Sequence, residues 1–297
     1  MTTLLTGASG FVGAFVQRRI DCTPLDRRGK QVDLCDRDEV RTAVGEIKPD
    51  AVIHLAAQSF VPASFENPQE TYDINFRGTL NLLSALKDTG FRGRMLFTGS
   101  GDTYGLVPES HLPVTEDQPL RPRSPYAVSK VAAEALCYQW SQTESFSVVM
   151  TRSFNHIGPG QSERFAVSDF ARQVIEIKKG RRKPTLDVGD IDVTRDFTDV
   201  RDTTAAYALL LERGRNGEVY NVCSGSENSL RSVLERLMRL ANVEARVVQD
   251  AARLRVSEQR RMRGSSAKLH ADTGWVPSLA LDQSLEDILQ DWEERLS

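Results

Sequence analysis

The stretch that decides the fold is Thr6–Gly13, TGASGFVG, which follows the short apolar run TLLT at residues 3–6. Its glycines, Gly7, Gly10 and Gly13, have the spacing G-x-x-G-x-x-G between a predicted strand and a predicted helix. Gly7 permits a tight turn, Gly10 lets a diphosphate approach the amides of the helix N-terminus, and Gly13 permits close packing of helix on strand. A purely structural turn is the alternative, but the strand–turn–helix context favours dinucleotide binding.

Outward from this loop, strands and helices alternate along the first half of the chain. Short apolar runs predict strands, and apolar residues three or four positions apart predict helices. The expected strands cover 3–6, 22–26, 51–57, 94–100 and 147–155, and the expected helices cover 11–20, 37–47, 68–90 and 125–142. This order predicts an α/β fold with a Rossmann-type, doubly wound parallel sheet, which binds ligands at the carboxyl ends of its strands.

The pattern changes after about residue 156, where the loop GPGQ is followed by helix-like and irregular pieces. Two amphipathic helices are expected near the end of the chain, at 229–241 and 282–295. We therefore expect a dinucleotide-binding Rossmann domain and a smaller C-terminal α/β lobe for the substrate. The first would comprise residues 1–156 and 196–225, and the second residues 157–195 and 226–297.

Bulk properties exclude several classes of function. The net charge of -3 gives no electrostatic reason for nucleic-acid binding. No apolar run reaches the roughly 18–20 residues of a membrane span, and the first residues do not resemble a signal peptide. The four cysteines have no metal or disulfide spacing, so we expect no metal, and free thiols suit the cytoplasm. The arginine cluster RRMR at 260–263 fits a solvated face or a phosphate site.

An acidic residue at the end of the second strand should bind the adenosine ribose. Asp26 in PLDRRG has this place, and Arg27 and Arg28 follow directly. Asp26 favours NAD because a carboxylate binds the ribose diol, whereas the arginines favour NADP because they bind a 2′-phosphate. The sequence leaves this choice open. Asp33 and Leu34 suit the adenine edge, although an ordinary acidic turn fits them equally well.

Two further motifs carry candidate catalytic groups. PYAVSK places Tyr126 and Lys130 four residues apart, so they share one face of a helix. An ammonium beside a phenol lowers the pKa of the phenol, and Tyr126 could then act as an acid or a base near neutral pH. SGDTYG, which starts at the end of a predicted strand, offers Ser100 as a hydrogen-bond donor and Asp102 as a proton acceptor.

Together these motifs resemble the extended short-chain dehydrogenase/reductase family, which contains sugar-nucleotide epimerases, dehydratases and reductases. The resemblance covers essentially the whole chain and rests on TGASGFVG, HLAAQSFVPASFENP, SGDTYG, PYAVSK, RSFNHIGPGQ, RDFTDVRD, YNVCSG and the late TGW. Two stretches, AAQSFVPASFENP and FNHIGPGQ, are most similar to the branch that handles GDP-mannose derivatives. The segment QRRMRGSSAKLHADTGW is more similar to the reductases of that branch than to its dehydratases.

The resemblance implies that Ser100, Tyr126 and Lys130 form the catalytic set, with Ser100 bound to the sugar 4-oxygen and Tyr126 protonating it. With the residues named above, the implied cofactor site is Gly7, Gly10, Phe11, Val12, Gly13, Asp26, Arg27, Asp33, Leu34, Leu55, Ala56, Ala57, Gln58, Asn75, Thr98, Tyr126 and Lys130. The implied substrate site is Ser100, Asp102, Tyr126, Asn155, Arg195, Arg255 and Glu258. The family often has a proline where this chain has Val256.

Asp102 separates two reactions. The dehydratases of the family abstract the sugar C5 proton with a glutamate two residues after the Ser/Thr, where this chain has the shorter Asp102. A loss of roughly 1 Å in reach can cost about a hundredfold in rate. A 4-keto reductase needs no such base. We therefore expect Ser100 to be the working hydroxyl and Asp102 to be a structural or water-binding carboxylate.

The expected activity is the reduction of GDP-4-keto-6-deoxy-D-mannose by NADPH or NADH to GDP-6-deoxy-D-mannose (GDP-D-rhamnose), for polysaccharide synthesis. The alternatives are a 4,6-dehydratase or 4-epimerase of the same fold, and a cofactor-sensing protein without catalysis, which would normally have lost the tyrosine or the lysine. The resemblance also implies a homodimer through the helix faces of Leu82, Leu83 and Leu86 and of residues 132–137. Core packing fits these residues equally well.

Overall fold

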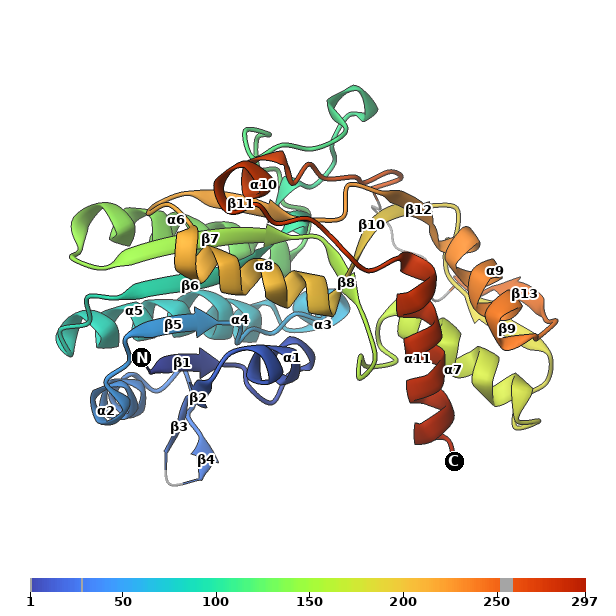
Figure 1. Ribbon diagram of the computed structural model, residues 1–297, viewed down its shortest axis with the longest axis horizontal. Helices are drawn as coiled ribbons and strands as arrows, with labels where there is room; N and C mark the ends of the chain where they lie inside the picture. Colours follow the sequence, from blue (N-terminus) through green and yellow to red (C-terminus); the bar gives the residue numbers. More distant parts are fainter. Residues whose placement is uncertain (1, 28, 252–258) are drawn as a thin grey trace.

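A six-stranded parallel sheet forms the centre of the computed structural model, which describes residues 2–27, 29–251 and 259–297. The strand order is β11-β7-β6-β5-β1-β2, and each neighbouring pair is parallel (Figure 1). The strands are β1 (Thr3–Thr6), β2 (Cys22–Pro24), β5 (Ala51–His54), β6 (Arg94–Ser100), β7 (Ser147–Ser153) and β11 (Val219–Val222). The predicted Rossmann-type sheet is confirmed, and its order reverses between β1 and β5, where such sheets bind ligands.

Helices cover both faces of this sheet, which explains why its strands are continuous apolar runs rather than alternating ones. One face carries α2 (Arg37–Ile47), α5 (Gly78–Asp88) and α6 (Pro125–Thr143), and the other carries α1 (Phe11–Arg19), α8 (Val200–Arg213) and α10 (Ala267–Thr273) (Figure 1). Leu82, Leu83 and Leu86 of α5 are fully buried within the chain. They therefore belong to the core, and the idea that they form a dimer face is wrong.

The segment predicted as one helix over 68–90 has three parts. It consists of α4 (Pro68–Tyr72), a π-helical turn (Asp73–Arg77) and α5, and the short α3 (Val61–Glu66) precedes it. A π-helical turn inserts a wider loop of backbone into a helix and is frequent at functional sites. Here it contains Asn75, which is buried.

A smaller group of elements lies beyond the ends of the strand arrows in Figure 1. Its helices are α7 (Ala166–Lys178), α9 (Leu230–Ala241) and α11 (Leu281–Arg295). Its strands are β8 (Asn155–Ile157), β9 (Thr185–Val188), β10 (Thr194–Asp199), β12 (Glu227–Ser229) and β13 (Arg246–Gln249). These elements share one apolar core that includes Val174, Leu237 and Leu289. The two amphipathic helices expected near the end of the chain are confirmed to within one residue.

Leu269 and Trp275 pack in the core cluster of the large sheet, beside Leu210 of α8. The indole Nε1 of Trp275 donates to the carbonyl oxygen of Asp202 in the same helix, at 3.0 Å. The chain thus returns from the smaller group to the sheet before it ends in α11. The expected domain boundaries stay a prediction.

The remaining short elements are β3 (Asp26–Arg27), β4 (Lys30–Gln31) and the 3₁₀ turns Gly101–Tyr104 and Glu109–His111. None of the helices in the described part of the chain is long and apolar enough to cross a membrane.

Candidate active site

The glycine loop joins β1 to α1 and contacts the loop that follows β5. Gly7 has a φ of 71°, and a Cβ added to it would lie 2.8 Å from the amide nitrogen of Ala56. A Cβ on Gly13 would lie 2.3 Å from the carbonyl oxygen of Gly7, whereas a Cβ on Gly10 would meet that oxygen at 3.3 Å. Within the described residues, α1 begins at Phe11 with no side-chain cap on its first amides. These amides and the bare Cα of Gly10 fit an anionic diphosphate.

Phe11 and Val12 begin α1, and both are half-buried. The ring of Phe11 is stacked on the ring of His156, with a centroid distance of 6.1 Å and an interplanar angle of 15°. Val12 packs against the core cluster below the loop. His156 directly follows Asn155, so this stack brings the start of α1 next to the predicted substrate segment.

Asp26 lies on a hairpin rather than at the end of the second strand. β2 ends at Pro24, and Asp26 pairs with Gln31 across the β3–β4 hairpin. The Asp26 side chain is exposed. Arg27 is the next residue of β3. Asp26 therefore lies two residues beyond the end of β2, rather than on its last residue.

Asp33 and Leu34 lie between this hairpin and α2. One carboxylate oxygen of Asp33 accepts the amide of Cys35 at 2.8 Å, so Asp33 forms a turn. Leu34 is buried, and its carbonyl oxygen accepts from Asn81 at 2.8 Å. Both residues are held firmly, and the ordinary-turn interpretation accounts for their contacts.

The loop after β5 carries Leu55, Ala56, Ala57 and Gln58, all half-buried. The amide of Ala56 donates to the hydroxyl of Thr6 at 3.1 Å. The Asn75 side chain accepts from the amide of Gln58 at 2.8 Å and donates to its carbonyl oxygen at 3.0 Å. The loop is thus fixed at both ends, which suits a surface that binds a rigid ligand.

Four predicted residues meet where β6 ends. The 3₁₀ turn begins after Ser100, whose hydroxyl accepts the amide of Asp102 at 3.2 Å. Helix α6 contains both Tyr126 and Lys130, and Tyr126 lies close enough to Ser100 for the Ser100 hydroxyl to lower the pKa of the phenol. The ammonium of Lys130 donates to the carbonyl oxygen of Thr98 at 2.9 Å. The structure therefore brings Thr98, Ser100, Tyr126 and Lys130 together.

The environment of Tyr126 favours its protonated form. Burial raises the pKa of Tyr126, the negative charge of Asp102 raises it further, and the hydrogen bond to Ser100 offsets part of the rise. Burial also lowers the pKa of Lys130 to about 8. The expected lowering of the Tyr126 pKa by Lys130 is wrong, because the ammonium is bound to a backbone carbonyl and lies over the ring of Phe97, 5.2 Å from its centroid. Near neutral pH, Tyr126 is an acid rather than a base.

Two further predicted substrate residues, Asn155 and Arg195, lie in the smaller group of elements. Asn155 is exposed on β8, and Arg195 is half-buried on the neighbouring β10. The guanidinium of Arg195 donates to the carbonyl oxygen of Gln259 at 2.9 Å. Arg255 and Glu258 lie outside the described residues.

Sequence reasoning missed a buried polar cluster beneath the 3₁₀ turn. Arg152 of β7 forms a two-bond ion pair with Glu134 of α6, at 2.7 and 2.9 Å. Arg152 also donates to the hydroxyl of Tyr104 at 3.0 Å, and Tyr104 donates to Asn221 at 2.6 Å. The cluster ties the turn that follows Ser100 to β7, α6 and β11. The one signal in the sequence was a charged residue inside the apolar run SVVMTRS.

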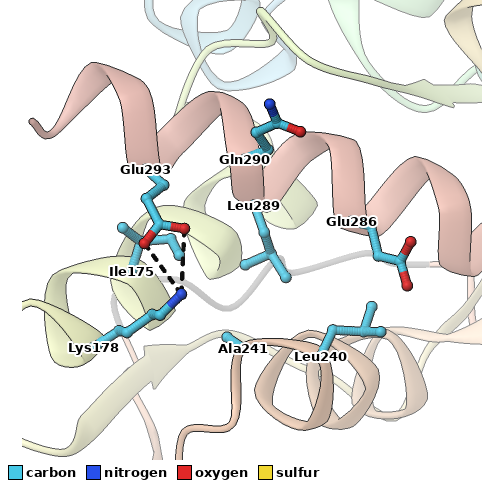
Figure 2. A pocket seen from close by; sticks show the side chains of 8 residues that line it. All are labelled: Ile175, Lys178, Leu240, Ala241, Glu286, Leu289, Gln290 and Glu293. Carbon is cyan, nitrogen blue, oxygen red and sulfur yellow. Dashed lines mark hydrogen bonds and ion pairs between the residues drawn. The ribbon is translucent and has the colours of Figure 1, made fainter.

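Two hollows lie elsewhere. One, of about 500 Å³, is lined by Leu106, Arg121, Pro122 and Arg123, just before α6. The other, of about 340 Å³, lies among α7, α9 and α11, with Leu240 and Leu289 at its floor and the ion pair of Lys178 and Glu293 at its rim (Figure 2). No predicted site residue lines either hollow. Among the described residues, no group of three or more His, Cys, Asp or Glu could hold a metal ion.

Comparisons with known proteins show what the chain is similar to. The chain is 50% identical to the GDP-6-deoxy-D-mannose reductase of Pseudomonas aeruginosa, over 98% of this chain and 97% of the relative. The solved structure of RMD from Pseudomonas aeruginosa complexed with NADPH matches with a TM-score of 0.92 and 48% identity, over 99% of both chains. The UDP-glucose 4-epimerase of Thermus thermophilus in complex with NAD matches with a TM-score of 0.85 and 30% identity, over 98% of this chain and 99% of that one.

The model of one protein family also matches residues 26–288, and its description is GDP-mannose 4,6 dehydratase. The match spans most of the chain, from the β3–β4 hairpin into α11. The resemblance to extended short-chain dehydrogenases/reductases is confirmed by the same family and by the structural matches. The chain therefore belongs to the GDP-mannose 4,6 dehydratase family of this fold.

Proposed function

We propose that the chain is an oxidoreductase that reduces the 4-keto group of GDP-4-keto-6-deoxy-D-mannose with NADPH or NADH and forms GDP-6-deoxy-D-mannose. One observation carries the proposal: Ser100, Tyr126 and Lys130 converge at the end of β6 in a chain that matches a GDP-6-deoxy-D-mannose reductase over nearly its whole length. The function would serve polysaccharide synthesis.

The dinucleotide fits the residues at the switch point of the sheet. The uncapped start of α1 and Gly10 would hold its diphosphate, and the loop of Ala56 and Gln58 would lie along it. Asp26 and Arg27 would contact the adenosine ribose from the hairpin. The ammonium of Lys130 would bind the nicotinamide ribose. When bound, the reduced cofactor supplies the hydride that the sugar C4 accepts.

The protein's own groups then supply the proton. Ser100 would hydrogen-bond the sugar 4-oxygen, and Tyr126 would donate its phenolic proton to that oxygen as the carbonyl becomes an alcohol. The raised pKa of Tyr126 is consistent with this role in one respect: the phenol is protonated before the reaction, so it has a proton to give.

Binding of the nucleotide would fall to the smaller group of elements. Asn155 would contact the sugar or its phosphate, and Arg195, with Arg255 and Glu258, would contact the diphosphate and its ribose. We propose the same division into residues 1–156 with 196–225, for the cofactor, and 157–195 with 226–297, for the substrate. The separate apolar core around Val174, Leu237 and Leu289 supports it.

We also propose a homodimer in the cytoplasm. Helix α6 exposes the apolar side chains of Val128 and Tyr138, at 40% and 55%, which supports a contact on this helix. The four cysteines are free thiols, which suits a reducing compartment. The molar mass in solution, measured by light scattering, tests the dimer.

A paired incubation tests the function. One sample holds GDP-4-keto-6-deoxy-D-mannose with NADPH or NADH, and the other holds GDP-mannose with the oxidised cofactor. Loss of nicotinamide absorbance in the first sample, with no reaction in the second, is expected, and the preferred cofactor decides between Asp26 and Arg27. A 4-keto product in the second sample would instead make Asp102 a working base and the chain a 4,6-dehydratase. An absence of reaction in the first sample refutes the proposal.

A further inference from the structure

His54 ends β5 beneath the predicted cofactor loop, and both of its ring nitrogens are bound. Nδ1 lies 2.7 Å from the hydroxyl oxygen of Thr6, at the end of β1. Nε2 lies 3.0 Å from the hydroxyl oxygen of Thr79, in α5. His54, Thr6 and Thr79 are each at most 2% exposed, so water does not share these bonds. A histidine in an apolar strand is often only a core residue whose hydrogen bonds are satisfied. The hydrogen-bond partners of His54 show whether it also acts on the predicted cofactor loop.

The partners fix the tautomer of His54. Thr79 donates its single hydroxyl proton to the carbonyl oxygen of Asn75 at 2.6 Å, so towards His54 it can only accept. Nε2 therefore carries the ring proton, and Nδ1 accepts the proton of Thr6. The oxygen of Thr6 in turn accepts the amide of Ala56 at 3.1 Å. The result is a directed chain of hydrogen bonds in which each hydroxyl donates once and accepts once.

The two ends of this chain of hydrogen bonds reach the same loop, which carries Ala56 and Gln58. Thr6 holds the amide of Ala56 at one end of it. Asn75 binds both the amide and the carbonyl oxygen of Gln58 at the other end, at 2.8 and 3.0 Å. His54 joins the two clamps, because it binds Thr6 directly and binds the π-helical turn of Asn75 through Thr79.

The chain of hydrogen bonds also continues to α6, the helix that carries Tyr126 and Lys130. The side-chain amide of Asn75 donates to the hydroxyl of Ser129 at 2.9 Å, and Ser129 donates to the carbonyl oxygen of Tyr126 at 2.6 Å. Ser129 is fully buried and lies between Tyr126 and Lys130 in α6. One line of hydrogen bonds thus runs from the glycine loop to the residues that would perform the reaction.

We infer that His54 is a positioning residue: through Thr6 and Thr79 it holds the Ala56–Gln58 loop in the one arrangement that binds the dinucleotide. The inference rests on the proposed reductase function. Burial, with a contribution from the charge of Lys130, lowers the pKa of His54 to about 3. The ring is therefore neutral under working conditions and keeps its one donor and one acceptor.

Thr79→Val tests the inference with little change of shape. It leaves Nε2 of His54 without an acceptor and loosens Asn75. A matched control is Thr203→Val in α8, because Thr203 is as deeply buried and donates to the carbonyl oxygen four residues earlier. The readouts are the Kd for NADPH from fluorescence titration, the KM for the keto sugar, kcat and the melting temperature.

Thr79→Val should raise the NADPH Kd about ten- to a hundredfold, the scale of a misplacement of about 1 Å, while the sugar KM stays within twofold. Thr203→Val should lower the melting temperature similarly and leave the NADPH Kd within twofold. An unchanged NADPH Kd in Thr79→Val would overturn the inference and make His54 a core residue only.

His54→Asn gives a second, independent reading. Its side-chain oxygen lies near the former Nδ1 and can still accept from Thr6, but it cannot reach Thr79, so the same rise in NADPH Kd is expected. An unchanged Kd in a folded His54→Asn would also overturn the inference. If the unaltered protein binds neither NADPH nor NADH, the proposed function itself fails, and the variants are not needed to show it.

Discussion

The glycine loop makes a prediction in which two neighbouring substitutions have different effects. Gly10→Ala and Gly13→Ala each add one methyl group to the same loop. The Cβ at Gly13 would lie 2.3 Å from the carbonyl oxygen of Gly7 and 2.7 Å from that of Ala8. The Cβ at Gly10 would meet the oxygen of Gly7 at 3.3 Å, and Gly10 has a φ of -80°, which alanine adopts freely.

These distances set the expected changes in the folding free energy. Non-bonded atoms approach favourably to about 3.5 Å, so Gly13→Ala forces the start of α1 away from the loop by about 1 Å. Overpacking of this kind costs about 1–3 kcal/mol of folding free energy. Gly10→Ala requires a shift of a few tenths of an ångström at most, so its folding free energy should change by less than about 1 kcal/mol. Its methyl group instead occupies the space through which a diphosphate approaches the helix amides.

Urea unfolding and NADPH titration separate the two effects. We expect Gly13→Ala to lose both stability and NADPH affinity, and Gly10→Ala to keep its stability and to bind NADPH at least about tenfold more weakly, a loss of about 1.4 kcal/mol. Gly45→Ala in α2 is the control, because its Cβ would lie 3.5 Å from the nearest atom, in Thr89. It should not affect NADPH binding. Unchanged NADPH binding by Gly10→Ala would refute the assignment of the diphosphate to this loop.

Three more results are expected. Tyr126→Phe removes the phenolic proton, so kcat should fall about 10²–10⁴-fold, and it keeps the buried ring, so the melting temperature should hardly change. Full turnover would exclude Tyr126 as the acid. Glu134→Gln leaves Arg152 without its counter-charge, so urea unfolding should show a loss of about 3–5 kcal/mol, and a loss below about 1 kcal/mol would mean that the pair is solvated. The pKa of Lys130 is about 8 in the folded state and 10.5 in the unfolded state. The unfolded chain therefore binds more protons between these two pH values, and the free energy of unfolding rises with pH across this window. Lys130→Met should remove that rise, which is at most about 3 kcal/mol, and an equal pH slope in both proteins would contradict it.

Much of the fold could be predicted because its signals are local. Apolar runs and helical periodicity located β6 and α2 to the residue, at 94–100 and 37–47. The β3–β4 hairpin was missed because its two-residue strands are too short for any periodicity. The pairing of β9 with β13 was missed because the two strands are about sixty residues apart and pair in parallel. Such contacts depend on the packing of α7 and α9, which a local pattern does not contain.

The candidate site divides in a similar way. Gly7, Gly10 and Gly13 could be placed because each spacing has a direct steric reason, and the structure shows the close backbone approaches at Gly7 and Gly13 that this reason requires. The ion pair of Arg152 and Glu134 could not be placed. The sequence shows two charges on different elements, and only the packing of α6 on β7 makes them partners.

The protonation of Tyr126 bears on the choice between the reductase and the dehydratase reading of Ser100 and Asp102. A 4,6-dehydratase needs a tyrosine ready to take up the proton of the 4-hydroxyl while C4 is oxidised, and then a carboxylate base near the sugar for the elimination. A ketone reduction needs a tyrosine that holds its proton and releases it late. The charge of Asp102 raises the pKa of Tyr126, and burial raises it more, so the phenol is protonated before the reaction begins. Asp102 thus favours the protonated tyrosine from which a ketone reduction starts, whereas a dehydratase must start with a tyrosine that can take up the proton of the sugar 4-hydroxyl.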